Sequence, residues 1–145
     1  MLSIAEVEAA GTQDLGVTPW RRVDADHNAI YTAALCLTGS PPATVPISAL
    51  NQAGGIVPFT YILSLVPSML SEALTITDMR GRINYGIEGV RYITPVPVGS
   101  RIRTRATLLE SEKRSAGLLY QISVEVEIDG GDTPALAGVL LFLVF

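Results

Sequence analysis

The sequence predicts an α+β domain in which one long apolar helix is wrapped by a curved antiparallel β-sheet. Three observations predict this fold class. Residues 56–74 are apolar at almost every position, apolar residues recur at every second position from Gly81 onward, and no repeat or linker divides the chain. A helix that is apolar on every side has to be covered on every side, and a sheet with one apolar face supplies that cover by curving around it. We therefore expect residues 1–145 to form a single domain.

Composition and charge limit the partners that the chain is expected to have. It has 145 residues, of which 48% are apolar and 17% charged, the balance of a folded domain with a large core. A net charge of −4 argues against nucleic acid, because phosphate binding needs a basic face. The longest apolar run, ALAGVLLFLVF, is too short to cross a bilayer, so we expect no membrane partner. The high apolar share favours a homodimer that hides part of the surface.

The single cysteine and the start of the chain favour the cytoplasm. Cys36 has no second cysteine with which to form an intrachain disulfide, which fits a reducing compartment. The segment MLSIAEVEAAG carries acidic residues where a signal peptide has a basic start and an apolar run. Cys36 itself lies within an apolar segment, where a buried structural thiol is the expected role.

Helices are predicted in the first half of the chain. Residues 1–18 are mixed and are expected to be partly strand and partly irregular. Residues 24–37 predict a helix that Asp24 caps, that Gly39 and the prolines after it end, and whose apolar stripe is formed by Ile30, Ala33, Ala34 and Leu37.

A loop and the central helix follow. Residues 40–55 form the loop, and the apolar run IVPFTYILSLVPSMLSEAL follows it. Pro58 suits the first turn of a helix, where its missing N–H costs nothing. We therefore expect a buried helix over residues 58–74, with a kink or a break at Pro67.

The second half of the chain predicts antiparallel strands. A bulge is expected near Glu88 and Gly89, because the apolar alternation up to Ile87 resumes out of phase at Val90. Two further strands alternate apolar residues with charged ones, arginines on the first and glutamates on the second, and residues 134–145 form the last. Cross-strand ion pairs are expected between Arg101, Arg103 and Arg105 and Glu125 and Glu127.

The stretch INYGIEGVRYITPVPVGSRIRTRATL, residues 83–108, contains the motifs N-Y-G, V-R-aromatic and P-V-x-x-G followed by an alternating strand. VEVEIDGGDTPALAGVLLF adds a G-x-x-x-P-A-x-A pattern, and Trp20, NAIYTAALCLTG and ILSLVP fit as well. These features resemble the MaoC-like hydratase/dehydratase family, in particular its NodN-type branch. The resemblance implies a hot-dog fold, usually dimeric or with two fused copies. It also implies acyl-thioester substrates, carried on coenzyme A or acyl carrier protein.

The same resemblance implies where the catalytic residues of the family would fall. Its catalytic aspartate and histidine correspond to Ser40 and Val45, and its small-His-Gly turn, which binds the thioester carbonyl, corresponds to Val57, Pro58 and Phe59. Hydration of an enoyl thioester needs a base, an acid and N–H donors aimed at the enolate oxygen. Serine and valine cannot act as that acid–base pair near neutral pH. The usual hydratase chemistry is therefore expected to be lost.

Other polar residues are candidates for the lining of a pocket between the loop, the start of the central helix and the strand at residues 83–92. They also have ordinary structural roles, in finishing a loop or in packing with a hydroxyl at the rim. The expected substrate-binding residues are Asn51, Gln52, Pro58, Phe59, Tyr61 and Tyr85, with Thr60 and Asn84 as further polar candidates.

The lone histidine and the remaining motifs indicate no cofactor. His27 is expected to be a surface neighbour of the helix cap, and no second metal ligand lies near it in sequence. No phosphate-binding loop or nucleophile motif is present in the sequence. We expect neither a metal ion nor an organic cofactor.

Three functions stay open. The first is an enzyme that isomerises or cyclises a bulky hydrophobic polyketide- or acyl-type molecule, a reaction that needs shape more than polar groups. The second is a non-catalytic acyl-binding or partner subunit of an active hydratase or dehydratase. The third is a residual acyl-thioester hydratase.

Overall fold

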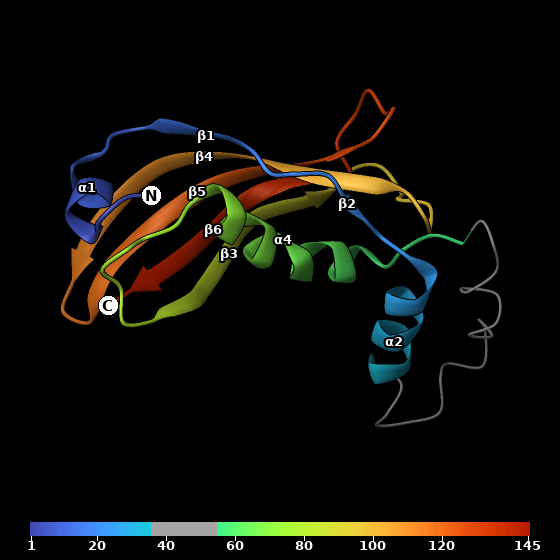
Figure 1. Cartoon of the computed structure of the whole chain (residues 1–145), viewed down its shortest axis with the longest axis horizontal. Coiled ribbons are helices and arrows are strands. Elements are labelled where there is room, and N and C mark those ends of the chain that lie inside the picture. Colours follow the sequence, from blue (N-terminus) through green and yellow to red (C-terminus); the bar gives the residue numbers. More distant parts are fainter. Residues whose placement is uncertain (36–54) are drawn as a thin grey trace.

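A computed structural model describes residues 1–35 and 55–145 of the chain. In that part, a curved six-stranded sheet in the order β1-β4-β5-β6-β3 encloses a helix, with β2 also paired to β4 and every pairing antiparallel (Figure 1). The predicted α+β class and antiparallel sheet are confirmed. The elements are α1 Ile4–Ala9, β1 Gln13–Val17, β2 Arg21–Arg22, α2 Ala25–Leu35, α4 Phe59–Ala73, β3 Arg82–Tyr92, β4 Arg101–Arg114, β5 Gly117–Ile128 and β6 Leu136–Val144.

Helix α4 lies on the concave side of the sheet but is not buried all round. Its buried face consists of Tyr61, Ile62, Val66, Met69 and Leu70. The expectation of burial on every side is therefore wrong, because the sheet covers one face only. The opposite face is exposed and carries Thr60, Ser64, Ser68, Ser71 and Glu72.

Pro67 does not break α4. The helix runs through it from Phe59 to Ala73, so of the predicted alternatives, a kink or a break into two pieces, the break is wrong. The neighbouring strand supports this turn, because the Arg82 guanidinium donates to the Pro67 carbonyl at 3.3 Å and to Ser71 Oγ at 2.8 Å. A charged donor from the sheet thus satisfies backbone and side-chain acceptors close to the residue that lacks an N–H.

The strands follow the alternation of the sequence closely. In β4, residues Ile102, Thr104, Ala106 and Leu108 are buried, and the side chains between them face outward. The predicted bulge is confirmed as a shift of register between Glu88 and Arg91, with Gly89 at φ 57°. A positive φ of this kind suits glycine, which has no Cβ to clash.

The expected ion pairs form only in part on the outer face of β4 and β5, because Arg101 pairs with Asp129 and Glu125 has no ion pair among the described residues. Arg103 and Arg105 both bind the carboxylate of Glu127, at 2.6 and 2.9 Å. Arg103 also lies over the ring of Trp20, 4.5 Å from its centroid, a contact that the sequence did not predict. These arginines therefore have a structural role on the solvated outer face of the sheet, where they pair with a carboxylate and stack on an aromatic ring.

The N-terminal segment contains a helix that was not predicted. Residues 1–18 were expected to be partly strand, which β1 confirms, but α1 precedes it. Ser3 accepts from the N–H of Glu6 at 3.2 Å, and the Glu6 carboxylate accepts from the N–H of Ser3 at 2.7 Å. This capping box is readable as S-x-x-E, and it explains why so short a helix forms.

Helix α2 begins where predicted, but the side chains that it buries differ from the predicted ones. Asp24 caps it, accepting from the N–H of His27 at 2.9 Å. Asn28 and Thr32 are buried, whereas Ile30 is 66% exposed and Ala34 is exposed, so these two residues of the predicted apolar stripe do not face the core. Of that stripe, Leu37 falls outside the described residues. Ile30 and Ala34 instead face the cavity described next.

Candidate functional site

An open hollow lies between β2, α2 and the first turns of α4. Its volume is about 630 Å³. Apolar and aromatic side chains, Ile30, Tyr31, Tyr61 and Leu65, make up most of its wall. A hollow of this size with a mainly apolar wall suits an apolar small molecule better than a strongly polar one.

Two tyrosines join the helices that form the wall. The rings of Tyr31 on α2 and Tyr61 on α4 stack with centroids 4.8 Å apart and an interplanar angle of 25°. Burial raises the pKa of the Tyr61 hydroxyl, with a smaller contribution of the same sign from the charge of Asp24. Tyr61 therefore stays protonated near neutral pH and can donate a hydrogen bond.

The rim of the cavity is polar and is held by the sheet. β2 pairs with the start of β4, and the backbone of Val23 continues that pairing through bonds to Ser100 at 2.9 Å and Gly99 at 2.7 Å. The chain therefore enters α2 at a fixed place. Arg21, Arg22, Asp24 and His27 follow one another along this rim.

Asp24 and His27 are in direct contact at this rim. Asp24 Oδ1 accepts from the backbone N–H of His27 at 2.9 Å, and Oδ2 lies 3.0 Å from ring Nδ1 of the same residue. The backbone bond is the main cause of the lowered pKa of Asp24. His27 is thus a neighbour of the helix cap, as expected, and it also lines the cavity.

The two arginines of the rim have different partners. Arg21 donates to Glu72 at 2.5 Å and to Ser68 Oγ at 3.3 Å, which ties its charge to α4. Arg22 forms no ion pair with any residue in ranges 1–35 and 55–145. Arg22 is therefore the rim cation that an anionic group of a ligand would meet first.

The start of α4 differs from a carbonyl-binding turn. Pro58 is the N-cap residue and provides no side-chain hydrogen bond. Phe59 stacks on Tyr92 at the end of β3, with ring centroids 4.6 Å apart and an angle of 18°. Among the described residues that line the cavity, Tyr61 is present, whereas Pro58 and Phe59 lie outside its wall.

The candidates on β3 lie elsewhere. Tyr85 is 61% exposed at the edge of the sheet and does not line the cavity. Asn84 lines a separate, smaller apolar hollow of about 190 Å³ beneath Leu63 and Pro67 of α4. The structure therefore divides the polar residues that were expected to share one pocket.

Several candidates fall outside the described residues. Most of the 40–55 loop lies there, as do Cys36, Ser40, Val45, Asn51 and Gln52. In the part of the chain that is described, no three histidine, cysteine, aspartate or glutamate side chains lie close enough together to hold a metal ion. Nor does any described helix have the length and hydropathy needed to cross a membrane.

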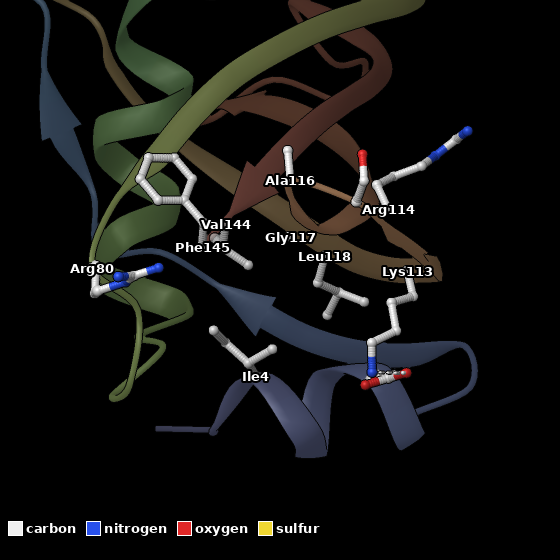
Figure 2. A pocket seen from close by; sticks show the side chains of 11 residues that line it. Ile4, Arg80, Lys113, Arg114, Ala116, Gly117, Leu118, Val144 and Phe145 are labelled. Carbon is white, nitrogen blue, oxygen red and sulfur yellow. Dashed lines mark ion pairs between the residues drawn. The ribbon is translucent and has the colours of Figure 1, made fainter.

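A second hollow, of about 350 Å³, lies at the other end of the molecule, between α1, the β4–β5 turn and the end of β6 (Figure 2). Lys113 points toward α1, where its amino group lies 3.8 Å from the Glu8 carboxylate. Arg114 points away from Ile4 and Leu118 and binds Glu112 at 2.8 Å. The cations of this hollow do not converge on a common point, so we assign no chemistry to it.

Sequence reasoning missed Tyr31, Leu65 and the arginines of the rim. Two local signals were available, the dipeptide Arg21-Arg22 and the Asp24-x-x-His27 spacing at a helix start. Neither signal shows that α2 packs beside α4, because that contact joins residues far apart in the chain.

Comparisons with known proteins give the following relatives. No family model matches the sequence. Nodulation protein N of Rhizobium leguminosarum bv. viciae is 30% identical over a gapped alignment of 151 positions, which covers 93% of this chain and 86% of that protein. The 3-hydroxyacyl-thioester dehydratase Z of Mycobacterium tuberculosis is 28% identical over 138 residues, covering 92% and 89%.

Solved structures agree on the fold. The (R)-hydratase of A. caviae involved in PHA biosynthesis superposes with a TM-score of 0.65 at 21% identity, covering 94% of this chain and 97% of that one. The MaoC-like dehydratase of Rhodospirillum rubrum gives a TM-score of 0.66 at 14% identity, covering 94% and 92%. The hot-dog fold implied by the sequence motifs is thereby confirmed.

Proposed function

Since this chain belongs to the MaoC-like hydratase/dehydratase family, we propose that it binds a bulky hydrophobic acyl- or polyketide-type molecule between α2 and α4 and isomerises or cyclises it. The observation that carries the proposal is the wall of the 630 Å³ cavity, which is formed largely by Ile30, Tyr31, Tyr61 and Leu65. Burial of apolar ligand surface there is worth about 25 cal/mol per Å². Holding a flexible chain in a reactive conformation then lowers the barrier without many polar groups.

The start of α4 supports a departure from ordinary hydratase chemistry. The turn that corresponds to the family's carbonyl-binding turn contains Pro58, which has no N–H, and Phe59, whose ring is stacked on Tyr92. An incoming thioester carbonyl would have to displace that aromatic contact. The resemblance also implies Ser40 and Val45 at the positions of the acid–base pair, and on both grounds we favour a changed reaction over residual hydration.

We further propose that the protein is a homodimer that pairs through the β3 edge. Among the described strands, β3 pairs with β6 alone. Its exposed side chains are apolar, with Ile83 at 49%, Tyr85 at 61% and Ile87 at 56%. A long apolar edge strand favours pairing with another chain. The same edge would serve the alternative role of partner subunit to a different hydratase chain.

A binding experiment tests the proposed ligand class. The polyene fatty acid cis-parinaric acid, whose fluorescence rises in apolar sites, is titrated into the purified protein. We expect binding that Leu65→Trp weakens at least about tenfold by filling the cavity, because a lost apolar contact area of about 55 Å² costs about 1.4 kcal/mol. Arg103→Ala on the outer face is the matched control and should bind as the wild type does.

Two results would contradict the proposal. One is undiminished binding by Leu65→Trp. The other is a wild-type protein that ignores the polyene and binds only crotonyl-coenzyme A, which would favour the residual-hydratase alternative. A wild type that binds the polyene but forms stable complexes only with a separate hydratase chain would favour the partner-subunit alternative.

A further inference from the structure

The geometry of the rim points to a proton-transfer pair that the family motif does not contain. The Asp24 carboxylate meets His27 at two points, accepting from its backbone N–H at 2.9 Å and lying 3.0 Å from ring Nδ1. A helix cap needs only the backbone bond, which any residue other than proline at position 27 would provide. The contact with Nδ1 involves the imidazole itself, and His27 is the only histidine in the chain.

The contact of Nδ1 with the carboxylate indicates which ring nitrogen is free to act as a base. A carboxylate accepts hydrogen bonds, so Nδ1 is the nitrogen that carries the proton in neutral His27. Nε2 is then left as the basic nitrogen of a ring whose orientation Asp24 sets. A carboxylate that orients an imidazole and stabilises its protonated form is an arrangement that supports general base catalysis.

The pair lies where a ligand of the cavity would reach it. Asp24 and His27 belong to the same wall as Tyr31, Tyr61 and Leu65. The ring of His27 is accessible, with 69% of its side chain exposed, so Nε2 does not have to break an internal contact before it meets a substrate.

The charged and titratable groups around the ring are few. β2 contributes Arg21, whose charge is tied to Glu72, and Arg22. α4 contributes the neutral hydroxyl of Tyr61, and α2 itself contributes Tyr31 and the exposed Asp26 of its first turn. Asp24 is therefore the anion in contact with the imidazole, and Arg22 is placed to attract an anionic or carbonyl-bearing end of the substrate.

We propose that His27, oriented by Asp24, is the group that takes and returns a proton on a substrate held in the α2–α4 cavity. This inference rests on the proposed function, in which that cavity holds an unsaturated acyl- or polyketide-type chain. His27 acts as the catalytic residue and Asp24 as the positioning residue.

The step balances without a co-reactant. Nε2 removes a proton from the γ-carbon of an α,β-unsaturated thioester, and the C–H electron pair forms the new β,γ double bond while the original π pair moves toward the carbonyl oxygen. The imidazolium then returns the proton to the α-carbon, and the enolate becomes a thioester again. The double bond has moved by one position, and the enzyme is unchanged.

The test follows hydrogen exchange, which does not depend on knowing the natural substrate. The probe is the α,β-unsaturated decenoyl thioester of N-acetylcysteamine in deuterated buffer, with deuterium at the α- and γ-carbons measured by mass spectrometry. We expect exchange by the wild type and a loss of about 10²-fold or more in His27→Gln, the usual contribution of a general base. Binding of cis-parinaric acid should be unchanged in that variant.

Two further variants separate positioning from folding. Asp24→Ser keeps a residue that caps helices well, so the helix is retained while the ring loses its orienting carboxylate. We expect exchange to fall and its dependence on pH to shift, with the circular dichroism and Tm retained. Asp26→Asn, in the same helical turn, is the matched control and should exchange as the wild type does.

Each outcome decides the proposal. Exchange by His27→Gln at the wild-type rate overturns it, as does a wild type that binds the polyene but exchanges no deuterium. In both cases the proposed cavity stands. A wild type that fails to bind cis-parinaric acid overturns the proposed function instead, and His27 then loses its role with it.

Discussion

The β4–β5 hairpin and the α2–α4 corner use charged side chains in opposite ways. On the hairpin, Arg103 and Arg105 share the carboxylate of Glu127, so both cations have an ion-pair partner on a regular sheet. At the corner, Asp24 binds an exposed histidine, and Arg22 has no ion-pair partner among the described residues. The charged side chains of the hairpin thus pair with one another and stabilise the fold. At the corner, an imidazole and a guanidinium instead lie beside a large apolar cavity.

The largest expected effect concerns the hydration of enoyl thioesters. The sequence motifs match Ser40 and Val45 to the family's acid–base positions, and a general acid and base contribute roughly 10²–10⁴-fold each, so we expect crotonyl-coenzyme A to be hydrated at least about 10⁴-fold more slowly than by an active hydratase. Loss of absorbance of the conjugated thioester measures the rate. Turnover at the rate of an ordinary hydratase would contradict the proposed loss of the acid–base pair.

The second expected effect concerns stability. Phe142 is 1% exposed and stacks on Tyr120 with centroids 5.4 Å apart. Phe142→Ala should lower the free energy of unfolding by about 3–5 kcal/mol, because it leaves a cavity under the sheet. Tyr31→Ala at the corner removes an aromatic pair from a half-buried position and should cost about 0.5–1.5 kcal/mol. Urea denaturation measures both, and equal losses would show that the corner is as much a part of the core as the sheet is.

The third expected effect concerns assembly. Ile87→Lys places a charge on the apolar β3 edge and should convert the proposed dimer to a monomer in sedimentation velocity experiments. Glu125→Lys changes an exposed side chain on the outer face of β5 and should leave the dimer intact. A wild type that is monomeric at micromolar concentration, or a dimer unaffected by Ile87→Lys, would contradict pairing through the β3 edge.

Sequence patterns predicted the hairpin well and the corner poorly, for physical reasons. Side chains of a strand alternate regardless of what packs on them, so Ile102 and Arg103 could be assigned to opposite faces directly. In α4, the small serines lie within what the sequence predicts as an apolar helix, and Ser64 bonds within the helix, to the Tyr61 carbonyl at 2.7 Å. These serines lie three or four positions apart and form the polar, exposed face of the helix.

Site residues were harder to predict, because a cavity depends on how elements pack. Tyr61 was expected from its polar tip near the start of the central helix, and the structure places it in the wall. Tyr85 has a similar chemical character but lies on an edge strand. Tyr31 was missed because its partner is Tyr61, thirty residues later in the sequence, and only the packing of α2 beside α4 brings the two rings together.

The smallest expected effect concerns the hairpin ion pairs. The Arg103 guanidinium, with help from Arg105, lowers the pKa of Glu127. A lowered folded-state pKa means that the carboxylate stabilises the fold above its unfolded pKa and that this contribution is lost as the pH falls through the folded value. Because all three side chains are partly exposed, Glu127→Gln should cost only about 0.2–1 kcal/mol near neutral pH, and the difference should vanish in acid. Thermal unfolding across this pH range measures it, and a difference that grows in acid would contradict the assigned cause.

A crystal structure with the decenoyl thioester of N-acetylcysteamine tests the central claim most directly. The account predicts density for the acyl chain between α2 and α4, against Tyr31, Tyr61 and Leu65, with the unsaturated carbons beside Nε2 of His27. Density in the smaller hollow beside Asn84, or an empty α2–α4 cavity in crystals of a protein that binds the thioester in solution, would contradict it.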